Sequence, residues 1–230
     1  MSETGDSRGM ALVRVWDAPV RLFHWLLVAL VAFMFVSGKL DWMTWHMRCG
    51  YTVLALVLFR VLWGFVGSST ARFSSFLAGP SAVLGFARRL LSRGDASTPG
   101  HNPLGGWMVL LLLAVLLTQA GTGLFANDDV LSEGPLAALV RKDTSDQLST
   151  IHYWNSYLLL LLVALHVIAV AYHWLVKKEN LVGAMFTGAK RVPAAAAAES
   201  AATRFASPWR ALALLGVAAL AVYLIVNRPF

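Results

Sequence analysis

The chain has 230 residues, of which 58% are hydrophobic and 13% charged, and its mean hydropathy is +0.64. This composition excludes a water-soluble globular domain and is typical of a protein that crosses a membrane several times. The formal net charge of +7 is no sign of nucleic-acid binding, because the basic residues gather in the connections on one side of the apolar segments.

In chain order, five apolar segments are long enough to cross a bilayer: residues 22–38, 49–66, 104–125, 151–176 and 209–226. In lipid, the backbone of each segment must satisfy its own hydrogen bonds, and the segments are longer than the ~10-residue strands of a membrane barrel. We therefore predict an all-α integral membrane protein, with a four-helix transmembrane bundle and one additional C-terminal transmembrane helix.

The chain is expected to divide into four parts: an unstructured cytoplasmic tail (1–13), a transmembrane domain (14–190), an alanine-rich linker (191–208) and the extra helix (209–230). The last helix contains no His, Asp or Glu, so its expected role is packing against the bundle or a partner subunit.

Two connections carry patterns of their own. Residues 67–102 mix apolar side chains with arginines, which predicts a helix in the membrane interface, with a solvated loop as the alternative. Residues 126–150 are rich in Asp and Glu, and either dock a basic partner or form a plain solvated loop.

The distribution of Lys and Arg predicts the orientation. Thirteen of them lie before the first span, between the second and third, or between the fourth and fifth, whereas five lie on the opposite side. By the positive-inside rule, the N-terminus is predicted to be cytoplasmic and the C-terminus periplasmic, in a bacterial inner membrane. Because no cleavage site for a signal peptide is evident, the first span is expected to be retained.

Two histidines in the fourth span, His152 and His166, are the most informative residues of the chain. They are fourteen residues apart, so both rings project from nearly the same helix face. At ~1.5 Å per residue, about 21 Å of helix separates them, which is most of a ~30 Å hydrocarbon core. Imidazoles at such depths tend to mark function, and one ring near each membrane face predicts two stacked cofactor sites.

His24 and His46 complete the pattern. The predicted topology puts His24 with His166 on the cytoplasmic side, and His46 with His152 on the periplasmic side. Two histidines from facing helices can fill both axial positions of a haem iron, which predicts electron transfer. The chain has a single cysteine and no CxxCH motif, so two non-covalent b-type haems are expected. For any one histidine, the alternative is a polar residue hydrogen-bonded to a neighbouring carbonyl.

Four further residues are candidates for contacts with a haem propionate or a quinone. Arg60 lies fourteen residues after the histidine of the second span, near the depth of the inner pair, where it could bind a propionate. Arg21 lies about one turn before the histidine of the first span. For both arginines the alternative is snorkelling to the interface. His101 and His173 fall near the cytoplasmic interface, either in a quinone site or as polar residues with no special role.

The chain resembles the bacterial cytochrome b561 family, which includes the b-type cytochrome subunits of membrane-bound nickel–iron hydrogenases. The resemblance covers residues 13 to about 190 and rests on VWDAPVRLFHW, HMRCGYTVLALVLFRVLWGFVG, FLAGP, GHNPLGGWMVL, GLFANDD, EGPL and LVALHVIAVAYHWLVKKENLVGAMFTG. It implies a four-helix haem-binding bundle with two b haems, bound by histidines that match His24, His46, His152 and His166. The fifth span lies outside the family core.

The family passes electrons between quinone and a partner redox protein, so we expect a di-haem cytochrome that connects the quinone pool to a periplasmic c-type cytochrome or hydrogenase. The outer loops are short for a hydrogenase-type member, which favours the c-type cytochrome or a stand-alone protein. One alternative is a quinone-linked oxidoreductase that acts on a small oxidant such as superoxide at the outer haem. Another is a haem-free anchor or transporter whose histidines relay protons.

Overall fold

The computed structural model describes residues 9–91, 102–193, 197 and 204–227. Their helices and strands are, in chain order, β1 (Met10–Arg14), α1 (Ala18–Lys39), α2 (Met43–Val66), the short 3-10 turn η2 (Ser69–Ala71), α3 (Phe73–Phe76), α4 (Pro80–Leu91), α5 (Pro103–Gly123), the 3-10 turn η3 (Ala137–Leu139), α6 (Lys142–Leu175), α7 (Leu181–Thr187), β2 (Ala189–Pro193) and α9 (Pro208–Val226).

Within the described residues, five helices are long and apolar enough to cross a membrane: α1, α2, α5, α6 and α9. The predicted fold class, a helical membrane protein with five spans, is therefore confirmed. α6 is the longest, with 34 residues, and begins at Lys142 rather than near residue 151. Its first turns are polar, and they extend past the apolar segment from which the span was predicted.

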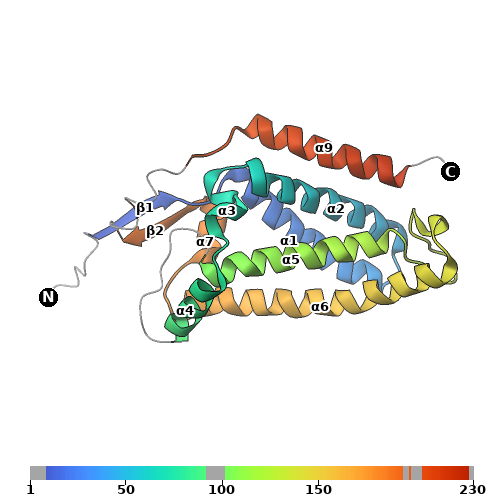
Figure 1. Ribbon diagram of the computed structural model, residues 1–230, viewed down its shortest axis with the longest axis horizontal. Helices are drawn as coiled ribbons and strands as arrows, with labels where there is room; N and C mark the ends of the chain where they lie inside the picture. Colours follow the sequence, from blue (N-terminus) through green and yellow to red (C-terminus); the bar gives the residue numbers. More distant parts are fainter. Residues whose placement is uncertain (1–8, 92–101, 194–196, 198–203, 228–230) are drawn as a thin grey trace.

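α2 is the central helix of the bundle. It packs against α1, α5 and α9, while α6 packs along α5. In the most apolar stretch of α2, half of the residues are buried inside the protein, compared with 17% in the corresponding stretches of α1, α6 and α9. In Figure 1, α9 runs alongside α2, on the face of α2 that is remote from α6.

Asp17 ties the start of α1 to the end of α2. Its carboxylate caps α1 by accepting a hydrogen bond from the amide of Val20 at 2.8 Å, with a proline in the first turn. The other carboxylate oxygen accepts from the indole N–H of Trp63 at 2.9 Å. Both Asp17 and Trp63 are buried, so this contact fixes how α1 and α2 pack at that end.

A two-stranded antiparallel ribbon lies at the same end of the bundle, where Figure 1 shows β1 and β2 side by side. It pairs Met10 with Pro193 and Arg14 with Ala189. The expectation of an unstructured tail is therefore wrong for residues 10–13, because pairing with β2 satisfies their backbone hydrogen bonds. The ribbon starts from Gly188, whose φ of 81° favours glycine and whose carbonyl accepts from two amides that follow β1.

The described part of the connection after α2, residues 67–91, contains η2, α3 and α4. A helix therefore forms in this connection, as predicted, and its place in the membrane interface stays a prediction. α4 has two unlike faces: Phe86 is buried, whereas Leu84 and Arg88 are exposed. The rest of this connection, residues 92–101, lies outside the described part of the chain.

Several carboxylates of the acidic connection after α5 form hydrogen bonds or ion pairs within the protein. One carboxylate oxygen of Asp128 accepts hydrogen bonds from three successive amides, 130 to 132, and these lower the pKa of Asp128 to about 2. Lys142 forms ion pairs with Asp129 and Asp146. The loop is thus an ordered turn held against the first turns of α6.

Candidate functional site

The structure brings together the two histidines expected on the cytoplasmic side. The ring centroids of His24 on α1 and His166 on α6 are 6.4 Å apart, with an interplanar angle of 57°. Both side chains are half-buried. The Nδ1 atom of His24 is fully buried and has no hydrogen-bond partner among the described residues.

The second pair has nearly the same separation. His46, in the first turn of α2, and His152 on α6 have ring centroids 6.3 Å apart at an interplanar angle of 75°. Nδ1 of His46 lies 3.1 Å from the carbonyl oxygen of Met34 and 3.2 Å from the hydroxyl of Ser37. Because a carbonyl can only accept, Nδ1 carries the proton, and Nε2 is left as the nitrogen with a free lone pair.

α5 holds His152 in a similar way. Nδ1 of His152 lies 2.9 Å from the carbonyl oxygen of Gln119, and the hydroxyl of Thr122 is 3.4 Å from the same atom. The side-chain amide of Gln119 lies 3.1 Å from Nε2, and Asn155 donates to its oxygen at 2.7 Å. Nδ1 again donates to a backbone carbonyl and Nε2 accepts. The Gln119 amide must therefore turn aside for Nε2 to bind a metal.

Two glycines leave room for the outer pair of rings. A Cβ atom on Gly123 would lie 2.9 Å from Cε1 and 3.1 Å from Nδ1 of His152. A Cβ atom on Gly38 would lie 3.3 Å from the ring of His46. The backbones of α5 and α1 can thus approach the two imidazoles because these positions carry no side chain.

The geometry of both pairs fits a single metal ion between the two rings. Metal–imidazole bonds of about 2 Å, with about 1 Å more from each ligating nitrogen to its ring centre, give a separation of roughly 6 Å. An apolar hollow of ≈ 520 Å³, lined by Phe33, Trp42 and Trp45, opens where α1 meets the start of α2, which carries His46. None of the four histidines lines this hollow. Paired imidazoles from facing helices are the donor set that a b-type haem requires.

Arg60 is buried in the bundle, with 2% of its surface exposed. Its guanidinium lies 5.5 Å from the ring centre of Phe73. Among the described residues, Nη1 has no hydrogen-bond partner. A buried donor without a partner is costly, and a haem propionate is one group that would satisfy it.

Arg21 ties α1 to α7. Its guanidinium donates to the carbonyl oxygen of Phe186, while Nε is buried without a hydrogen-bond partner among the described residues. A Cβ atom on Gly188 would come within 3.2 Å of that Nε atom. The Arg21 side chain therefore packs against the α7–β2 corner. His101 lies outside the described residues.

His173 belongs to a buried ionic cluster at the end of α6. Its Nδ1 atom lies 2.6 Å from a carboxylate oxygen of Glu179, and Lys190 on β2 pairs with the other oxygen. Burial alone would raise the pKa of Glu179, but the contacts with His173 and Lys190 outweigh it and lower that pKa to about 2. The cluster joins α6 to the ribbon.

The contacts that hold the rings were not predicted from the sequence. Gln119 and Thr122 are polar residues in an apolar span, three apart, and this spacing is the signal that could have indicated a shared target on a neighbouring helix. The contact of His46 with the backbone carbonyl of Met34 could not have been predicted from the sequence, because every residue has a backbone carbonyl.

Comparison with known proteins adds an independent finding. The family model described as prokaryotic cytochrome b561 matches residues 15–188. Two curated relatives, from Azotobacter chroococcum mcd 1 and Azotobacter vinelandii, are named as probable Ni/Fe-hydrogenase B-type cytochrome subunits. They are 27% and 26% identical, over 81% of this chain and 93% of each relative. No solved structure is similar enough to count as a match. The resemblance noted in the sequence is thereby confirmed: the chain belongs to the prokaryotic cytochrome b561 family of membrane-embedded b-type cytochromes, which function in electron transport.

Proposed function

We propose that this protein is a di-haem b-type cytochrome that transfers electrons across the bacterial inner membrane, between the quinone pool and a periplasmic redox partner. His24 and His166 would be the axial ligands of the haem nearer the cytoplasm, and His46 and His152 those of the outer haem. The observation that carries the proposal is the repetition of one geometry: two ring pairs, 6.4 and 6.3 Å between centroids, two heptads apart on α6.

A haem held by these histidine pairs would supply one-electron chemistry. The chain would contribute the orientation of the ligands. The carbonyls of Met34 and Gln119 hold the Nδ1 protons of His46 and His152, which leaves the two Nε2 atoms as the nitrogens that would hold the iron and would make them better donors. Arg60 would donate its unpartnered Nη1 to a propionate.

The interval between the ring pairs suits electron transfer through the membrane. Leu159 and Leu162 lie between the two histidines of α6 and are almost fully buried. Apolar packing there keeps water out of the space between the two sites, so that electrons cross without ions. With the N-terminus in the cytoplasm, the inner site would face the side where we propose that quinone reacts.

We assign the cytochrome function to residues 14–190 and regard 209–230 as an added helix. The curated relatives are named as hydrogenase subunits. These names favour a hydrogenase as the periplasmic partner over the c-type cytochrome that the short outer loops suggested.

Single histidine variants test the proposal. His24→Ala and His166→Ala should each lose the same haem, and His46→Ala and His152→Ala should each lose the other, measured as haem per chain and by redox titration. The controls are His101→Ala and His173→Ala, which should keep both haems. The assignment is wrong if His24→Ala and His152→Ala remove the same haem, or if a control loses one.

A further inference from the structure

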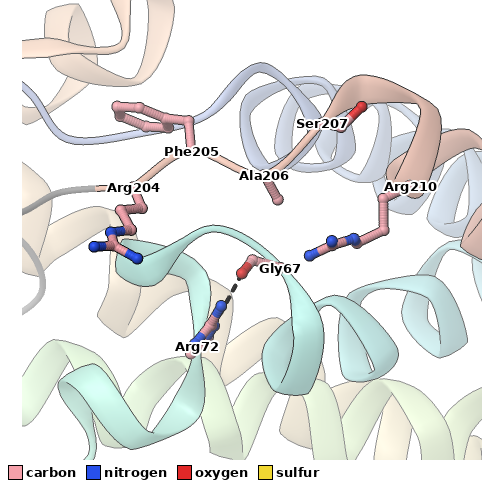
Figure 2. A pocket seen from close by; sticks show the side chains of 7 residues that line it. All are labelled: Gly67, Arg72, Arg204, Phe205, Ala206, Ser207 and Arg210. Carbon is pink, nitrogen blue, oxygen red and sulfur yellow. Dashed lines mark hydrogen bonds between the residues drawn. The ribbon is translucent and has the colours of Figure 1, made fainter.

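A basic pocket lies where the added helix meets the bundle, far from the four histidines in the sequence. It has a volume of ≈ 240 Å³, and its lining includes Arg72, Arg204 and Arg210 (Figure 2). Arg72 comes from the turn after η2, Arg204 from the lead-in to α9, and Arg210 from the first turn of α9. The fold thus collects three guanidinium groups from segments about 130 residues apart in the chain.

The lead-in to α9 is fixed in place by backbone contacts. The amide of Ser69 donates to the carbonyl of Arg204, whose own amide donates to the hydroxyl of Ser69, at 2.9 and 3.0 Å. The amide of Ala206 donates to the hydroxyl of Ser68 at 3.0 Å. Arg14 of β1 stacks on the ring of Phe205, 4.7 Å from its centre. The pocket is therefore a built feature of the fold.

The end of α2 orients two of the three arginines. Nε of Arg72 donates to the carbonyl of Gly67 at 2.9 Å, the contact drawn in Figure 2, and Nη1 of Arg210 donates to the carbonyl of Val66 at 3.3 Å. Each contact uses one nitrogen of the fork and leaves the other two. The C-terminal carbonyls of a helix attract cations, which helps to hold the guanidinium groups close together.

The three charges are not neutralised within the described part of the chain. The ion pairs found there join other residues, and none includes Arg72, Arg204 or Arg210. The first turn of α9 adds to the positive potential, because Ser207 caps it without a side-chain hydrogen bond. Like charges gathered at one pocket repel one another, and an anion bound between them would remove that cost.

We infer that this pocket binds the phosphate of an anionic phospholipid. Two membrane-spanning helices, α2 and α9, end and begin at it, which puts the guanidinium groups at the depth of lipid headgroups. Arginine forks bind phosphate oxygens in pairs. Trp209 and Leu212 of α9 are exposed and offer apolar surface to the acyl chains. The lipid would join α9 to the bundle at this end.

The inference is tested on the purified full-length protein in detergent by native mass spectrometry. The probes are phosphatidylglycerol, the zwitterionic phosphatidylcholine and inorganic phosphate. The double variant Arg204→Gln/Arg210→Gln is compared with Arg88→Gln/Arg191→Gln, which removes the same charge from exposed positions of α4 and β2. The single variant Arg204→Gln is included because that side chain makes no contact on which the described fold depends.

The wild-type protein should bind phosphatidylglycerol at least tenfold more tightly than phosphatidylcholine. The pocket double variant should lose about tenfold or more of that affinity, Arg204→Gln a smaller part, and the control double variant little. Equal loss in the two double variants, or equal binding of the two lipids, would overturn the inference. So would saturable binding of inorganic phosphate that displaces phosphatidylglycerol, since the site would then be one for free phosphate.

Discussion

Replacing Gly123 by alanine should weaken the outer haem site although it leaves every proposed ligand in the sequence. The new Cβ atom would lie 2.9 Å from Cε1 of His152, whereas carbon atoms pack at about 3.5 to 4.0 Å. The imidazole must therefore retreat, and its Nδ1 atom is held 2.9 Å from the carbonyl of Gln119. Losing that hydrogen bond costs about 1 kcal/mol, and overpacking costs about 1–3 kcal/mol more.

Together these effects amount to about 2–4 kcal/mol, or a thirty- to several-hundred-fold loss of haem affinity at the outer site. The assay is haem titration of the apoprotein, followed by the reduced-minus-oxidised spectrum. Two matched glycine-to-alanine variants show whether the loss of haem affinity follows the closeness of the new Cβ atom to a histidine ring. Gly121→Ala lies on the same helix with nothing within 4 Å of its Cβ position, and Gly38→Ala approaches His46 only to 3.3 Å. The expected order of loss is Gly123, Gly38, then Gly121. Wild-type affinity in Gly123→Ala, or an equal loss in Gly121→Ala, would refute the reasoning.

Three further outcomes are expected. Asp17→Ala should lower the free energy of unfolding by about 2–4 kcal/mol, because it removes the cap of α1 and the acceptor for the buried Trp63 indole. The control is Ser207→Ala, at a cap without a side-chain hydrogen bond, which should change the free energy of unfolding by less than about 0.5 kcal/mol. Denaturant titrations measure both. The pKa of Glu179 is lowered from its ordinary 4.5 to about 2 in the folded protein, so its ionised form stabilises the fold above pH 4.5, and that stability is lost as the pH falls towards 2. The melting temperature of Glu179→Gln should therefore lie below that of the wild type at pH 6, and the gap should close by pH 2 to 3; a gap that widens in acid would contradict this. Arg60→Met should lower the midpoint potential of the inner haem alone, because loss of a nearby cation disfavours the reduced state. If both midpoint potentials were unchanged, Arg60 would not be a propionate ligand.

Much of the architecture could be predicted because it depends on properties that act locally along the chain. A run of apolar residues long enough to span a bilayer must be a helix, whatever its neighbours, so α1, α2, α5, α6 and α9 follow from hydropathy alone. The first turns of α6 could not be predicted in this way, because residues 142–150 are mostly polar and lie before the apolar segment.

What could not be predicted depends on contacts between distant parts of the chain. β1 and β2 are five-residue strands about 180 residues apart, and neither has a pattern that requires a partner. The cluster of His173, Glu179 and Lys190 depends on a turn in which Lys178 has a φ of 58°. The positions of Gln119 and Thr122 against His152 depend on how α5 and α6 are aligned along their length. Spacing along one helix predicted which histidines face one way, but not which carbonyls would orient their rings.

The haem content of the purified chain tests the central proposal most directly. Haem extracted as the pyridine complex and divided by protein from amino-acid analysis should give two haem b per chain, with the low-spin spectrum of two imidazole ligands at each iron. One haem per chain, none in protein from haem-replete cells, or a high-spin spectrum at either site would contradict the pairing of His24 with His166 and of His46 with His152.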